Sequence, residues 1–365
     1  MSPSVLRAVV ILVMPAVLMA QPPRALPAPN ARLVEEFAHV SAVRELNDGR
    51  VLIADNLEGR LVVADLRAGS VVRIGRVGNG PGEYSAVDEL YWLPGDSTLM
   101  PSDERHSRWL LLVGSQIVAT LAPDDARLAF AGRRLVGADA SGRLLALRSL
   151  PGIELAGGRS QAADAVVLIS RDRTRIDTIA RLRGAETRMV VAGSAERPRR
   201  MLYQVVYSVA DQAVLFPDGW IAVAYQQPYR VDWIAPDRSA LRGPELPWQY
   251  PRVTETEKAA YGKHLVRRVG PRAKLPPEMP WAETVPPFRE SALLAAPDGS
   301  LVVLMEQWSG SPATEYEVVN RRGQRSFTLA LHWNERIVGF GSRSAYVAVA
   351  DDDGIERLER HLWKP

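Results

Sequence analysis

The stretch that decides the fold is LNDGRVLIADNLEGRLVVADLRAGSVVRIGRVGNGPGEY, residues 46–84. Asn47-Asp48-Gly49 is a hairpin turn signal, because an Asx-Gly pair readily adopts the positive φ angles of a tight turn. Short apolar runs alternate with such turns at residues 50–55, 61–65 and 71–74. The stretch therefore predicts one antiparallel sheet of four short strands.

The same turn signal recurs along the chain, and an apolar run follows it each time. The turns are Asp48-Gly49, Gly95-Asp96, Ser141-Gly142, Asp218-Gly219, Asp298-Gly299 and Ser342-Arg343. A four-strand unit repeated about every 40 to 50 residues is typical of β-propeller blades, and two longer spacings indicate insertions. We predict an all-β fold, a six-bladed β-propeller of four-stranded antiparallel blades. The alternative is a β-sandwich, which also shows regularly spaced turns.

The two ends of the chain predict how the ring closes. The last repeat stops after its third strand. Residues 32–37, before the first repeat, look like an outer strand that belongs to none of the predicted blades so far. If this segment completes the last blade, the ring leaves no exposed edge. The predicted divisions are a signal peptide at 1–20, a proline-rich linker at 21–31 and one propeller domain at 32–365. Insertions are expected at 150–164, 184–201 and 246–289.

The first twenty residues indicate export. Arg7 precedes an apolar run at residues 8–20, and a cleavage site after Ala20 fits a secretory signal. The run is shorter than the roughly 20 residues that span a bilayer, which disfavours an uncleaved anchor. The chain has no Cys, so it has no disulfide framework and no lipid-attachment cysteine. We expect a periplasmic or extracellular protein without a transmembrane span in the mature chain.

Composition is that of an ordinary globular protein, with 47% hydrophobic residues, 24% charged residues and a formal net charge of +3. The basic residues are scattered among acidic ones, so the sequence predicts no nucleic-acid partner. We expect a monomer.

Chain direction predicts which face the insertions occupy. In each blade the Asp-Gly turn joins the first strand to the second on one face of the propeller. The loops between the second and third strands, and the links from one blade to the next, therefore lie on the opposite face. All three insertions are of this latter kind, and insertions gathered on one face typically mark the binding face. Within 246–289, Thr254 and Glu257 form a capping box, and Gly270-Pro271 ends the predicted helix. This helix is either a lid over the channel mouth or a cover for apolar blade surface.

The ends of the second strands are expected to ring the channel mouth on the insertion-bearing face. Carboxylate and amide oxygens there suit a cation such as Ca²⁺ or a polar small molecule, although such strand ends are also ordinary turn positions. The candidate metal ligands are Asp55, Asp103, Glu306 and Asp351. The wider set of channel-mouth candidates adds Asn56, Glu83, Arg148, Gln226 and Trp308.

The sequence contains few motifs that are typical of a catalytic site. The histidines are single, no His-x-x-x-His occurs, and no Gly-x-Ser-x-Gly elbow is present. The glycine-rich segment around Glu83 matches no nucleotide-binding fingerprint and favours a structural turn. The sequence identifies no enzyme.

The pattern GxxGxGPGEY at residues 75–84, directly after DGRVLIAD and GRLVVAD, resembles that of secreted bacterial six-bladed β-propellers of the NHL and TolB-like type. The later Pro286-Pro287-Phe288 followed by PDGSLVV at residues 297–303 is similar to their fifth blade. The resemblance implies the propeller fold over most of residues 32–365. Distant relatives include calcium-dependent lactonases and a virginiamycin-type lyase. Two functions follow as hypotheses: a binding module for a small molecule, peptide or protein on the insertion-bearing face, or a metal-assisted hydrolase or lyase at the channel mouth.

Overall fold

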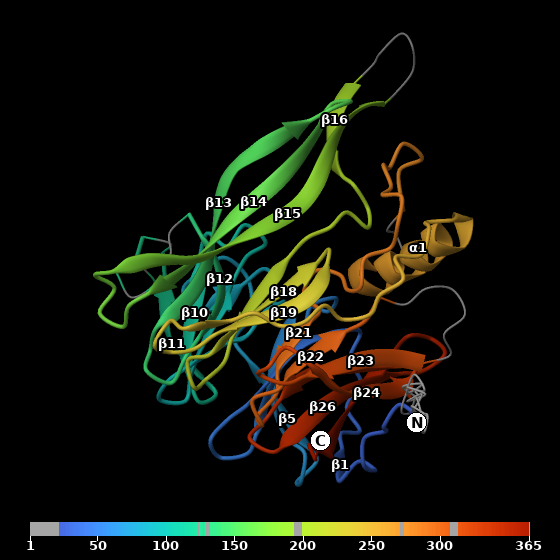
Figure 1. Ribbon diagram of the computed structural model, residues 1–365. Helices are drawn as coiled ribbons and strands as arrows, with labels where there is room; N and C mark the ends of the chain where they lie inside the picture. The colour runs from blue at the N-terminus through green and yellow to red at the C-terminus, as the bar shows by residue number, and fades with distance from the viewer. Residues whose placement is uncertain are drawn as a thin grey trace, which may run out of the picture.

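The computed structural model describes residues 22–364, except 123, 127, 129–131, 193–198, 271–273 and 307–312. The predicted signal peptide at 1–20 lies outside the described residues. Within them, the chain forms six antiparallel sheets of four or five strands, one short parallel pair and one helix (Figure 1). No helix in this part of the chain has the length and apolar character needed to cross a bilayer.

Each predicted turn and apolar run falls at the same place in its sheet. The glycine of the first turn takes φ angles of +83° to +86° in four sheets, at Gly49, Gly142, Gly219 and Gly299. The first three sheets are β2 (Val40–Glu45), β3 (Val51–Asp55), β4 (Arg60–Asp65), β5 (Ser70–Ile74); β8 (Tyr91–Leu93), β9 (Ser97–Pro101), β10 (Trp109–Val113), β11 (Gln116–Leu121); and β12 (Arg134–Ala138), β13 (Leu144–Leu155), β14 (Arg159–Ile169), β15 (Ile176–Ala192), β16 (Arg199–Gln204).

The second half of the chain repeats the pattern. Its sheets are β17 (Gln212–Leu215), β18 (Ile221–Gln226), β19 (Tyr229–Ile234), β20 (Ala240–Leu241); β21 (Leu293–Ala295), β22 (Leu301–Leu304), β23 (Ala313–Val319), β24 (Arg325–His332); and β25 (Glu335–Phe340), β26 (Ser344–Ala350), β27 (Glu356–Leu362), β1 (Ala31–Arg32). The parallel pair is β6 (Arg76–Val77) and β7 (Glu83–Tyr84), and the helix is α1 (Glu255–Val269).

The core shows that the sheets form a ring. Six clusters of buried apolar side chains each join one sheet to the next, and the cluster around Phe37 and Tyr346 joins the last sheet to the first. A ring of stacked antiparallel sheets is the architecture of a β-propeller. The fold class predicted from the sequence is confirmed.

The N-terminal segment closes this ring as predicted. β1 pairs with β27, and the Leu33 amide donates to the Leu358 carbonyl at 2.9 Å. Further along, Phe37 and Glu356 exchange backbone hydrogen bonds of 2.9 and 2.8 Å. The predicted linker at 21–31 also packs onto the propeller. Arg24 lies along β24, and its amide donates to the Thr328 carbonyl at 2.8 Å.

The insertion at 150–164 corrects one expectation. We expected an irregular loop, but β13 and β14 continue through it as paired strands with a register shift between Leu150 and Ile153. The insertion at 184–201 likewise continues β15, and β16 returns along it. We call the parts of these strands that reach past the propeller, at residues 150–163, 184–192 and 199–204, the wing. Figure 1 shows it projecting from the ring, on the side where α1 lies.

Candidate functional site

Three of the predicted acidic residues accept hydrogen bonds from nearby donors of the chain. Asp55 accepts from the amides of Ala38 and His39 at 3.0 and 3.1 Å, and its side chain is buried. Asp103 accepts from the Ser107 amide and hydroxyl, and Asp351 from the Asp353 and Ile355 amides. These are the contacts of carboxylates that hold a loop shape.

Hydrogen bonds also govern the charge of Asp103. Its partial burial acts to raise the pKa, but the bonds from Ser107 outweigh burial and hold the pKa below its usual range. A shallow hollow of about 430 Å³ beside it is lined by Arg108, Arg105 and Glu104. Asp103 is thus an ionised loop anchor.

The glycine-rich loop has a structural role. Glu83 accepts from the Gly80 amide at 2.7 Å and from Arg76 Nε at 2.6 Å. A Cβ at Gly78 would lie 2.1 Å from the Glu83 carboxylate, so a larger residue there would have to displace this carboxylate. Tyr84, fully buried, donates to the Ile74 carbonyl at 2.9 Å and so ties the loop to the first sheet.

The four candidate metal ligands do not converge. Among the described residues, no group of three His, Asp or Glu side chains is placed to hold a metal ion. Asp55, Asp103, Glu306 and Asp351 thus form no such group in this structure, and each carboxylate has hydrogen-bond partners of its own. Asn56 contacts Asp88 at 3.4 Å, and Arg148 is exposed on β13. Trp308 lies outside the described residues.

The structure does bring Gln226 and Glu306 together around one segment. Gln226 Nε2 donates to the Phe288 carbonyl, and the Glu306 amide donates to the Pro287 carbonyl at 2.7 Å. Gln212 Nε2 donates to the carbonyl of Arg289, the next residue. Amide side chains of the fourth sheet thus fix the end of the long insertion against the fifth.

Arg289 is the functional candidate that the sequence did not indicate. Its guanidinium forms a two-pronged ion pair with Glu306, whose side chain is 0% exposed. Burial raises the pKa of the Glu306 carboxyl, and the positive charge of Arg289 opposes that rise. Arg289 Nη1 is buried and has no hydrogen-bond partner among the described residues. The site therefore keeps one donor unused.

Aromatic rings enclose the same guanidinium. Its carbon lies 5.9 Å from the Tyr207 ring centre and 5.6 Å from that of Tyr261 on α1. The two rings meet edge to face at 5.6 Å, and Trp281 packs against both. The capping box of Thr254 and Glu257 forms as predicted, so the start of this helix is fixed.

Tyr207 holds a strained backbone. Its φ is +63°, in the left-handed region that a bulky side chain seldom adopts. Its hydroxyl donates to the Glu257 carbonyl at 3.2 Å, and the amide of its neighbour Val206 donates to Pro280 at 2.9 Å. Strained residues concentrate at functional sites, where surrounding contacts maintain them.

These contacts join the segment that follows the wing to the 246–289 insertion. The segment after the wing, at Val206 and Tyr207, pairs and packs with Trp281 and Tyr261 of the 246–289 insertion. Tyr207 and Tyr261 from these two segments lie against the guanidinium of Arg289, which pairs with Glu306. We call Arg289, Glu306, Tyr207 and Tyr261 the Arg289 site.

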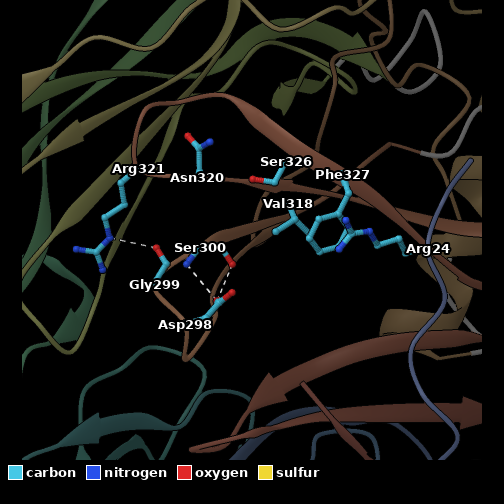
Figure 2. Close-up of a pocket in the computed structure, with 9 residues that line it drawn as sticks. All are labelled: Arg24, Asp298, Gly299, Ser300, Val318, Asn320, Arg321, Ser326 and Phe327. Atoms are coloured by element: carbon cyan, nitrogen blue, oxygen red, sulfur yellow. Dashed lines mark hydrogen bonds between the residues drawn. The ribbon is translucent and has the colours of Figure 1, made fainter. Parts of the chain in front are cut away.

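A hollow of about 440 Å³ lies elsewhere, by the turns of the fifth sheet (Figure 2). Two of its polar side chains have partners within the hollow: Asp298 accepts from Ser300, and Arg321 Nε donates to the Gly299 carbonyl at 3.2 Å. Arg24 lies over the Phe327 ring at 4.2 Å, so the N-terminal segment forms one wall.

No family model and no curated protein matches the chain. Solved structures similar to it include virginiamycin B lyase from Staphylococcus aureus, with 9% identity over 91% of this chain and 98% of that chain and a TM-score of 0.43. Regucalcin from Agrobacterium tumefaciens, a calcium-binding protein, has 10% identity over 92% and 96% of the two chains and a TM-score of 0.40. A luciferin-regenerating enzyme has 10% identity over 92% and 95% and a TM-score of 0.37. Such distant likenesses carry no argument about chemistry, so the function has to be argued from this chain's own contacts.

Proposed function

We propose that the protein is an exported binding module of the NHL and TolB-like propeller type, which receives its ligand on the insertion-bearing face at the Arg289 site. The observation that carries the proposal is the packing of the segment at Val206 and Tyr207 with the 246–289 insertion, beside a buried ion pair whose Arg289 Nη1 has no hydrogen-bond partner among the described residues. Export rests on the signal-like segment at residues 1–20.

The chemistry of the site favours a small polar molecule or a peptide side chain with an acceptor oxygen. Arg289 Nη1 supplies the donor, and the rings of Tyr207 and Tyr261 supply flat apolar faces beside it. Because Glu306 already balances the charge of Arg289, the site suits a ligand of low net charge. Tyr261 belongs to α1, so a movement of this helix would carry the Tyr261 ring away from Arg289 and give a ligand access to the guanidinium.

Ligand screening by thermal unfolding tests the proposal. Compounds of this class, sugars, amino-acid amides and short peptides, are added to wild type, to Tyr261→Ser and to Arg24→Ser, the last altering the hollow by the fifth sheet. A compound that binds only the folded state raises stability by about 2.7 kcal/mol at a hundredfold excess over Kd. We expect a compound that stabilises wild type and Arg24→Ser but not Tyr261→Ser; stabilisation lost in Arg24→Ser alone would refute the assignment.

Calcium titration in the same assay examines the metal-dependent alternative. The binding proposal places no cation at the Arg289 site. We expect equal unfolding temperatures with chelator and with added Ca²⁺. A rise with Ca²⁺ would instead favour a metal-assisted reaction.

A further inference from the structure

The wing projects away from the propeller ring (Figure 1). Five of its large apolar side chains are exposed by 42% to 63% of their surface: Ile153, Met189, Val191, Met201 and Leu202. Contiguous exposed apolar groups on a folded protein typically mark a surface of interaction. The Arg289 site accounts for none of them.

The strand register places these side chains on both faces. Met189 and Leu202 are direct partners across β15 and β16, and Val191 shares their face because side chains alternate along a strand. Met201 opposes Val190 on the other face. Ile153 lies there too, through its register with Gln161 and Glu186. A protein docked on one face would leave the apolar groups of the other in water.

Positive charge accompanies the apolar groups. Arg159 and Arg188 are direct cross-strand partners, an arrangement that destabilises a sheet unless negative charge lies nearby. Glu186 lies 3.4 Å from Arg159 and offsets part of this repulsion. Arg199 and Arg200 add two exposed positive charges on opposite faces of β16. An anionic surface would neutralise all of them.

We propose that the wing docks onto an anionic lipid surface. Its apolar side chains would enter the boundary between headgroups and acyl chains, and its arginines would contact lipid phosphates on both sides. The lipid boundary would surround the wing and cover the apolar side chains of both faces, whereas a protein docked on one face would cover only the side chains of that face. β16 is the edge strand of its sheet, and unpaired backbone groups are costly in hydrocarbon, so the wing enters no deeper than the interface. This inference goes beyond the proposed function, because it does not depend on the Arg289 site.

Vesicle flotation tests the docking. The chain beginning at Gln21 is used, because every contact described above lies within residues 22–364 and the apolar segment at 1–20 would itself bind lipid. It is mixed with vesicles of phosphatidylcholine containing phosphatidylglycerol, or of phosphatidylcholine alone. We expect binding to the mixed vesicles, weakened by salt, and little binding to the neutral ones.

Wing variants separate this docking from unspecific adhesion. The pair Arg199→Gln and Arg200→Gln is expected to weaken binding on the order of 20-fold, about fivefold for each arginine. The pair Val191→Ser and Leu202→Ser is expected to weaken it about tenfold or more. The matched controls Val72→Ser and Val118→Ser, at exposed positions on the edge strands β5 and β11, should bind as wild type does.

Two results would overturn the proposal. One is wild-type protein that does not float with mixed vesicles, which would leave an acidic protein as the occupant of the wing. The other is floating that both wing variants leave unchanged. Ligand binding at the Arg289 site, measured separately, is unaffected by either result, so the two proposals fail independently.

Discussion

Arg289 combines three interactions that seldom meet at one side chain: a buried carboxylate, two aromatic faces and an unused donor. Taking Glu306 out of water is costly, and among the described residues the guanidinium of Arg289 compensates that cost. Such a pair is weak evidence for stability, because well-packed apolar residues commonly do as well. Its placement beside the rings of Tyr207 and Tyr261 is better explained by recognition.

Replacing Arg289 tests whether the buried Glu306 carboxylate depends on the neighbouring positive charge. We expect Arg289→Met to lower the free energy of unfolding by about 3 kcal/mol, because the fully buried Glu306 carboxylate is left without its partner. Urea denaturation at neutral pH measures the change. Arg76→Met is the matched control, since it removes an ion pair with Glu83 in which the arginine is 81% exposed. That change should cost less than about 1 kcal/mol, and equal losses would contradict the argument.

At the scale of single elements, local signals predicted the strands well. The turn and apolar runs of each sheet lie where the sequence indicates, because tight turns and short buried strands depend on neighbouring residues. The wing was missed for the same reason. Pro151 and Gly152 read as loop residues, but the register shift between Leu150 and Ile153 accommodates them within the hairpin.

The candidate site was only partly predictable. Gln226 and Glu306 stood out as strand ends, and both do lie near Arg289. Arg289 itself follows a proline-rich segment with no periodic pattern, and its aromatic neighbours Tyr207 and Tyr261 come from segments far apart in the sequence. No local signal joins residues so far apart in the chain.

Contact between neighbouring sheets leads to a second prediction. A Cβ at Gly243 would lie 2.1 Å from the Val231 carbonyl oxygen and 3.0 Å from the Gly323 Cα, in the next sheet. Both are backbone atoms, which cannot move aside cheaply. Gly243→Ala should therefore destabilise by about 1 to 3 kcal/mol in urea denaturation. Gly137→Ala is the control, because its Cβ would lie 3.9 Å from its nearest neighbour; a comparable loss there would count against close packing as the cause.

The helix offers a third prediction. The Thr254 side chain accepts from the Thr256 amide, and Glu257 accepts from the Thr254 amide at 2.9 Å. Thr254→Ala should destabilise α1 by about 1 kcal/mol, because both bonds depend on the cap geometry. Hydrogen exchange should show faster exchange in the first turn of α1. Thr256→Ala, an exposed position in the same turn, should change exchange much less, and equal acceleration would rule out the cap as the cause.

At the scale of the whole molecule, one contact ties the end of the chain to its beginning. Glu356 at the start of β27 accepts from the Val40 amide at 2.7 Å and from Arg336 Nη2 at 2.8 Å, and His39 Nδ1 lies 3.2 Å away. Burial acts to raise the pKa of Glu356, but the hydrogen bond with His39 and the charge of Arg336 outweigh it and hold the pKa below its ordinary value of 4.5. The ionised carboxylate of Glu356 therefore stabilises the contact that closes the ring.

The sign of the pH dependence follows. Because the pKa of Glu356 is lower in the folded protein than in the unfolded chain, its contribution is fully present above about pH 5 and is lost as the pH falls through the folded pKa. Glu356→Gln should lower the free energy of unfolding at pH 7 by about 1 to 3 kcal/mol, since the buried partners lose a charged acceptor. Urea denaturation from neutral to acidic pH should show the gap between wild type and variant narrowing below pH 5. Glu36→Gln, whose carboxylate is 58% exposed, is the control and should leave the curve nearly unchanged. If the Glu356→Gln and wild-type curves stay parallel down to acidic pH, ionisation of Glu356 does not stabilise the closed ring.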